Sequence, residues 1–100
     1  MIKHVVMWQL CETEEHNKQE NAKKMKELLE GLKDKIEDIK AIKVGINDEN
    51  APQSNFDVIL EVQVEDFEAL NRYAKNPLHL EVVDFIKAVS KQRVAVDYRK

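Results

Sequence analysis

Three side chains of this sequence could form an acid–base site: His4, Tyr73 and His79. Histidine titrates close to neutral pH, so an uncharged imidazole ring can take a proton from a bound molecule. A tyrosine hydroxyl can donate a hydrogen bond to the oxygen anion that such a proton transfer creates. Tyr73 and His79 are close in sequence, whereas His4 is near the N-terminus. A site of this kind therefore depends on a fold that brings the first strand next to a later helix.

The pair Asn76-Pro77 predicts a break between two helices. Proline has no amide hydrogen and clashes with the preceding turn, so a helix over 67–75 must end before it. Asn76 can cap a new helix over about 77–90, with Pro77 at the first position, where proline is favoured. His79 is then in the first turn. The partial positive charge of the helix N-terminus favours a neutral imidazole ring at this place.

Hydrophobic periodicity predicts the other elements that position these residues. Alternating or β-branched runs indicate strands, and a 3.6-residue period indicates a long helix capped by Thr13. The expected strands cover 2–10, 39–47, 56–64 and 92–98, and the long helix covers 14–37. The order β-α-β-β-α-α-β is the ferredoxin-like arrangement of an α+β fold, with a four-stranded antiparallel sheet. Residues 1–100 are expected to form a single domain.

The strand expected over 2–10 is apolar on both of its sides. Val6 and Trp8 lie on one side, and Val5 and Met7 on the other. A sheet that has helices on one face normally exposes its second face to water. We therefore expect a second subunit to cover the other face.

Composition and charge exclude several classes of function. A net charge of -3 argues against nucleic acid as the main partner. No apolar run approaches the roughly 20 residues of a membrane span. The single cysteine cannot form an internal disulfide, which fits a reducing compartment, so a cytoplasmic protein is predicted. The histidines and carboxylates show no metal-ligand spacing and the two glycines form no phosphate loop, so we expect neither metal nor cofactor.

Five short motifs together resemble the stress-responsive α/β-barrel (Dabb) domain family. They are Ile2-Lys3-His4-Val5-Val6, Val44-Gly45, Asp57-Val58, Tyr73-x-x-Asn76-Pro77-x-His79 and Val96-Asp97-Tyr98. The resemblance covers nearly the whole chain and follows the predicted element order. It implies a homodimer in which two four-stranded sheets pack against each other as a dimeric α/β barrel.

One group in that family implies a use for the candidate residues. Plant polyketide cyclases of the olivetolic acid cyclase type carry out an aldol cyclisation in a pocket between sheet and helices. They use a strand-one histidine, the last histidine of a His-Pro-x-His motif, and a tyrosine three residues before that motif. These positions fall here on His4, His79 and Tyr73. This sequence has Asn76 at the first motif histidine, and Met25-Lys26 near the place of a further tyrosine on helix one.

Three functions are consistent with the sequence. The first is a homodimer that binds a small apolar or aromatic molecule in a pocket lined by Val6, Trp8, Met25, Leu29, Tyr73 and Phe85. The second is a cofactor-free lyase, cyclase or monooxygenase in which His79 is the general base, assisted by Tyr73 and His4. The third is a structural oligomer that protects against stress. A purely structural role is the alternative for both histidines, with His79 supporting a helix start and His4 satisfied in the core.

Overall fold

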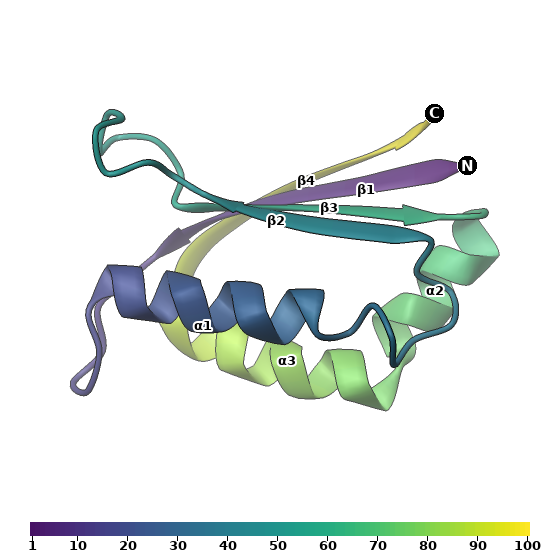
Figure 1. Cartoon of the computed structure of the whole chain (residues 1–100), viewed down its shortest axis with the longest axis horizontal. Helices are drawn as coiled ribbons and strands as arrows, with labels where there is room; N and C mark the ends of the chain where they lie inside the picture. Colours follow the sequence, from purple (N-terminus) through teal and green to yellow (C-terminus); the bar gives the residue numbers. More distant parts are fainter.

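The structure, a computed structural model, describes residues 1–100 as four strands and three helices (Figure 1). In chain order they are β1 (Ile2–Leu10), α1 (Lys18–Glu30), β2 (Ala41–Ile46), β3 (Val58–Val64), α2 (Phe67–Lys75), α3 (Pro77–Val89) and β4 (Ser90–Arg99). The strands form one antiparallel sheet in the order β2-β3-β1-β4. All three helices lie on the same side of this sheet (Figure 1). The ferredoxin-like prediction is confirmed.

Strand β1 lies between β3 and β4, and its register with β4 places polar side chains beneath the helices. Directly opposite residues of an antiparallel pair project from the same face of the sheet. His4 lies opposite Asp97, and Trp8 lies opposite Arg93. Trp8 is buried among the core side chains, so these four residues belong to the face that the helices cover.

The opposite face of the sheet carries apolar side chains that one chain leaves open to solvent. The exposed fractions are 39% for Met7, 39% for Val94, 63% for Val96 and 46% for Tyr98. No helix lies over this face (Figure 1). Large apolar side chains gathered on one face mark a surface suited to association.

Helix α1 is shorter than the predicted span of 14–37, and that prediction was wrong at both ends. Asn17, not Thr13, is the cap: its side chain accepts from the Glu20 backbone N–H at 2.9 Å, and Glu20 Oε1 accepts from the Asn17 N–H at 3.1 Å. This reciprocal pair is a capping box. The helix ends before Gly31, a residue that costs about 1 kcal/mol relative to alanine inside a helix.

The other predicted bounds agree closely with the structure. Helix α2 covers the predicted range 67–75. Helix α3 ends one residue earlier than predicted. Strands β2 and β3 begin two residues later, and β4 begins two residues earlier, directly after α3.

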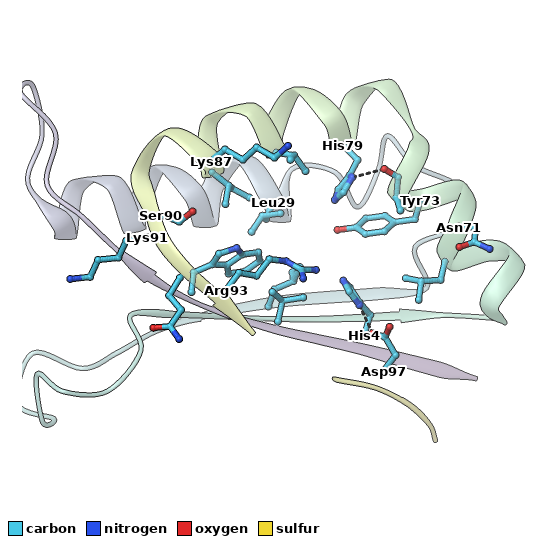
Figure 2. Close-up of a pocket in the computed structure, with 18 residues that line it drawn as sticks. His4, Leu29, Asn71, Tyr73, His79, Lys87, Ser90, Lys91, Arg93 and Asp97 are labelled. Carbon is cyan, nitrogen blue, oxygen red and sulfur yellow. Dashed lines mark hydrogen bonds and ion pairs between the residues drawn. The ribbon is translucent and has the colours of Figure 1, made fainter. Parts of the chain in front are cut away.

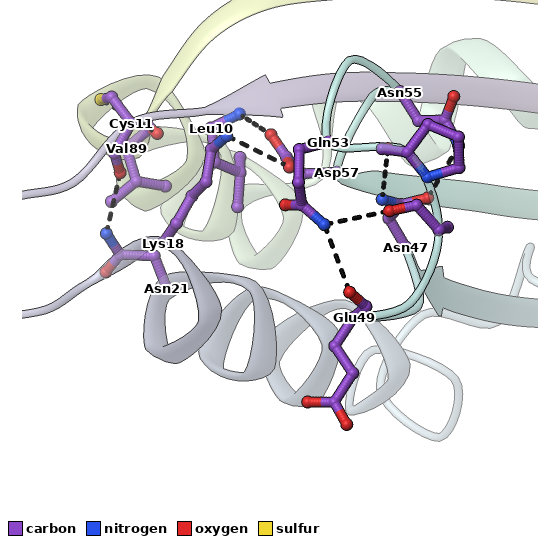
Figure 3. A network of polar contacts seen from close by, with 12 residues as sticks. Leu10, Cys11, Lys18, Asn21, Asn47, Glu49, Gln53, Asn55, Asp57 and Val89 are labelled. Atoms are coloured by element: carbon purple, nitrogen blue, oxygen red, sulfur yellow. Dashed lines mark hydrogen bonds and ion pairs between the residues drawn. The ribbon is translucent and has the colours of Figure 1, made fainter.

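A polar network, here called the α1 anchor network, ties the start of α1 to the ends of two strands (Figure 3). Asn21 is 1% exposed, and its Nδ2 donates to the Cys11 carbonyl at 3.2 Å. Asp57 accepts from the Leu10 N–H at 2.8 Å and pairs with Lys18 Nζ at 3.4 Å. Each buried polar group of this network therefore has a partner within the chain.

Candidate active site

A cavity of about 630 Å³ lies between the sheet and helices α2 and α3 (Figure 2). Its volume is within the range of about 300–1,000 Å³ typical of small-molecule sites. The lining is half apolar, with side chains that include Val6, Trp8, Leu29, Leu60, Leu70 and Ile86. The polar part of the lining includes all three predicted acid–base residues, His4, Tyr73 and His79.

Two of the six residues predicted to line the pocket, Met25 and Phe85, do not line this cavity. Val6, Trp8 and Leu29 line it as expected. Met25 is completely buried in the core and has no surface left to offer a ligand. Phe85 lies on the side of α3 that meets α1, with Lys24 Nζ 4.9 Å from its ring centroid. The helical period identified the right faces, but it does not show which turns of a helix border a cavity.

The joint between α2 and α3 places Tyr73 next to His79. Asn76 ends α2 with its backbone N–H donating to the Tyr73 carbonyl at 3.2 Å. The same residue begins α3, since its Oδ1 accepts from the Leu78 N–H at 2.9 Å. Pro77 occupies the first position of α3, as predicted. The ring centroids of Tyr73 and His79 are 4.3 Å apart across this joint.

His79 is held in one tautomer. Its Nδ1 lies 3.1 Å from the Ala74 carbonyl oxygen, and a carbonyl oxygen can only accept, so Nδ1 carries the hydrogen. In the neutral ring, Nε2 then has a free lone pair. Burial lowers the pKa of His79, and the charges of His4 and Arg93 lower it further, against the opposing effect of the Ala74 hydrogen bond. The side chain is therefore an uncharged base at neutral pH.

Tyr73 has a buried polar atom that lacks a hydrogen-bond partner. It is 1% exposed, and its hydroxyl has no hydrogen-bond partner in the chain. A buried polar group left without a partner costs about 1–3 kcal/mol. Burial raises the pKa of Tyr73, so the hydroxyl keeps its proton and can serve as a donor. Figure 2 shows this hydroxyl directed into the cavity.

His4, on strand β1, is the third of the predicted acid–base residues in the cavity. Its Nδ1 donates to Asp97 Oδ1 at 2.5 Å, which fixes the ring and leaves Nε2 as the other polar atom. The His4 and Tyr73 rings meet edge to face, with centroids 6.3 Å apart. Figure 2 shows the Tyr73 ring between those of His79 and His4. The three side chains predicted from the sequence therefore converge on one cavity.

Several polar residues of the cavity were missed in the sequence, and Asp97 and Arg93 are two of them. Asp97 was noted only as part of a motif, and Arg93 was not considered. Both reach the cavity through the pairing of β4 with β1, opposite His4 and Trp8. A register between strands more than eighty residues apart has no local sequence signal.

Two further features were sought in the structure: a cluster of metal ligands and a membrane-spanning helix. No group of three or more His, Cys, Asp or Glu side chains is arranged to hold a metal ion. None of the helices combines the length and the apolar character needed to cross a membrane.

The fold and the cavity together define a ferredoxin-like protein with a cavity of small-molecule size between its sheet and helices. The chain belongs to the stress-responsive A/B barrel domain (Dabb) family, whose sequence profile matches residues 2–100. The family resemblance found in the sequence motifs is thereby confirmed. No curated protein matches the chain in sequence.

Solved structures with the same fold come from bacteria and plants. A dimeric protein of unknown function from Bacteroides fragilis NCTC 9343 is 25% identical with a TM-score of 0.84, covering 99% of this chain and 95% of that one. A dimeric ferredoxin-like protein of unknown function from Thermobifida fusca YX is 18% identical, with a TM-score of 0.82 and coverage of 99% and 90%. The hydroxynitrile lyase of Passiflora edulis is 13% identical, with a TM-score of 0.77 and coverage of 97% and 90%.

Proposed function

We propose that the protein binds a small apolar or aromatic molecule in the cavity and acts on it by proton transfer, with His79 as the general base. One observation carries this proposal. The unprotonated Nε2 of a neutral histidine and an unpartnered tyrosine hydroxyl belong to the same small-molecule-sized cavity. A base and a hydrogen-bond donor at one place are the two parts that enolate or alkoxide chemistry needs.

The roles of the residues follow from their protonation states. His79 Nε2 takes a proton from an acidic C–H or O–H of the bound molecule. Tyr73 stays protonated and donates its hydrogen bond to the substrate oxygen on which negative charge develops. His4, fixed by Asp97, orients the same oxygen or returns the proton to the product. An aldol cyclisation and a lyase reaction both fit this arrangement, and neither requires a cofactor.

Cleavage of mandelonitrile is a direct test, because the structurally similar Passiflora edulis protein is a hydroxynitrile lyase. In this reaction His79 would take the hydroxyl proton, the carbonyl would form, and cyanide would leave with the C–C bond electrons. Release of benzaldehyde, followed by absorbance, gives kcat/KM. A linear polyketide analogue tests the aldol cyclisation in the same way. On the substrate that turns over, we expect His79→Gln to lower kcat/KM by about 10²–10⁴-fold, the usual contribution of a general base.

The control is His16→Gln, which removes an exposed histidine just before α1 and should leave kcat/KM unchanged. Unchanged turnover in His79→Gln would exclude the general-base role. Absence of turnover in the wild type on both substrate types would reject the enzyme in favour of the second candidate below.

The second candidate function is binding of a small apolar or aromatic molecule without turnover. It is favoured by Asn76, which stands where the cyclase motif has its first histidine and here acts only as a helix cap. In that case an aromatic ligand should bind equally well to the wild type and to His79→Gln. Isothermal titration calorimetry with 3-phenylpropanamide gives both affinities.

We further propose that the protein is a homodimer formed through the open face of the sheet. The support is the set of exposed apolar side chains there and the dimeric state of the related bacterial proteins. Native mass spectrometry should give a dimer for the wild type and a monomer for Val96→Lys, since an unpaired charge in an apolar interface is costly. A monomeric wild type would contradict this assembly. A purely structural, stress-protective role of the assembly stays a prediction.

A further inference from the structure

Three positive side chains of the cavity take no part in the chemistry proposed above. Lys87 is in the last turn of α3, and Lys91 and Arg93 are at the start of β4. None of the three forms an ion pair with another residue of the chain. The single carboxylate in the lining is Asp97, which is already bound to His4. This end of the cavity therefore has positive charge that the chain does not neutralise.

Arg93 is the cation best placed to meet a bound molecule. It lies opposite Trp8 on the face of the sheet beneath the helices. Figure 2 shows its side chain reaching into the cavity from β4, with His4, Tyr73 and His79 farther along. Arg93 and His79 both line this cavity, so the guanidinium and the imidazole ring belong to the same space. Trp8, at 5% exposed, adds an apolar wall to the same cavity.

We propose that Arg93 binds a carboxylate of the substrate, and that the substrates are aromatic or apolar carboxylic acids. A guanidinium presents parallel N–H donors that match the two oxygens of a carboxylate. The apolar wall at Trp8 and Leu29 accommodates the ring or chain of such a molecule, and Lys87 and Lys91 strengthen the attraction through their field. The end of the molecule remote from the carboxylate then meets His79 and Tyr73.

The reaction at the far end of this substrate depends on the function proposed above. Recognition of the carboxylate by Arg93 does not depend on it. A binding experiment therefore tests it separately. The probes are 3-phenylpropanoate and 3-phenylpropanamide, which have the same shape and differ in charge. Isothermal titration calorimetry should show the carboxylate binding to the wild type roughly 10- to 100-fold more tightly than the amide, the range expected for hydrogen bonds to a charged group.

Variants of two arginines on the same strand sharpen the test. Arg93→Gln should bind the two probes with equal affinity, and Arg93→Lys should show an intermediate preference, since it keeps the charge but loses the paired donors. Arg99→Gln is the matched control: Arg99 lies over the Phe67 ring, outside the cavity, and its loss should leave the preference as in the wild type. Unchanged binding of the amide shows that each variant is folded.

Several results would overturn the proposal. They are equal affinity of the wild type for both probes, an unchanged preference in Arg93→Gln, and binding of neither probe at millimolar concentration. A carboxylate preference that depends on Arg93, together with absence of turnover, would reject the enzymatic function and keep the carboxylate site. Turnover of a neutral substrate without a carboxylate preference would reject the carboxylate site and keep the enzymatic function.

Discussion

The two polar clusters of this molecule differ in how their hydrogen bonds are satisfied. In the α1 anchor network, Asn21 is buried and its amide donates to a backbone carbonyl, and Asp57 has both a backbone donor and a lysine. In the cavity, Tyr73 is equally buried but its hydroxyl has no partner. Buried polar groups in folded proteins nearly always have partners. The first cluster thus contributes stability, while the second contains a buried donor that the chain itself does not satisfy.

The largest effect on stability is expected in the satisfied cluster. Asn21→Leu keeps a similar volume but leaves the partly buried Cys11 carbonyl without its side-chain donor. The free energy of unfolding should fall by about 1–3 kcal/mol. Urea unfolding followed by circular dichroism measures this change.

The control for that variant is Gln19→Leu, an exposed position on the same helix, where the change should be within about 0.5 kcal/mol. Binding of 3-phenylpropanoate to folded Asn21→Leu should match the wild type. A loss of stability no larger than that of Gln19→Leu would remove the distinction between the two clusters.

A smaller effect of opposite sign is expected in the unsatisfied cluster. Tyr73→Phe removes the unpartnered hydroxyl and keeps the ring that packs against His79. The free energy of unfolding should stay the same or rise by about 1 kcal/mol. On the substrate that turns over, kcat should fall by about 10²-fold through loss of the donor to the substrate oxygen. A clear loss of stability would mean that the hydroxyl has a partner in solution, and the comparison would fail.

The smallest effect concerns pH. The groups that face His79 are Tyr73 from α2, His4 from β1 and Arg93 from β4, and the folded pKa of His79 lies below the ordinary value of 6.5. The unfolded chain therefore binds this proton more readily than the folded chain. Stability is unaffected well above pH 6.5 and falls as the pH decreases through and below that value.

The measurement is urea unfolding at about pH 7.5 and about pH 5.5, compared between the wild type and His79→Gln. The wild type should lose more stability between these two pH values than the variant does. An equal loss in both proteins would show that His79 does not titrate below its ordinary pKa.

Local signals account for the parts of the fold and site that could be predicted from the sequence. Asn76-Pro77 marks the joint between two helices, because a cap and a proline at the first position act within one turn. The start of α1 was missed because Thr13 also has a capping side chain. Asn17 followed three residues later by Glu20 is the more specific capping-box pattern and would have identified it.

Non-local contacts explain what could not be predicted. Asp97 and Arg93 join the site through the register of β1 with β4. Met25 and Leu29 have the same apolar character and lie one turn apart on α1, yet only Leu29 borders the cavity. The depth of a side chain within a packed layer depends on the neighbouring elements, which hydrophobic periodicity does not describe.

The position of Asn76 determines which residues of this site can change independently of one another. One asparagine ends the helix that carries Tyr73 and begins the helix that carries His79. An insertion or deletion in that joint would move one side chain relative to the other, so the pairing of Tyr73 with His79 depends on the length of the joint. His4 and Arg93 come from separate strands and can be replaced one at a time. If the proposed reaction takes place in this cavity, its substrate preference can change most easily at the sheet, while His79 and Tyr73 stay constant.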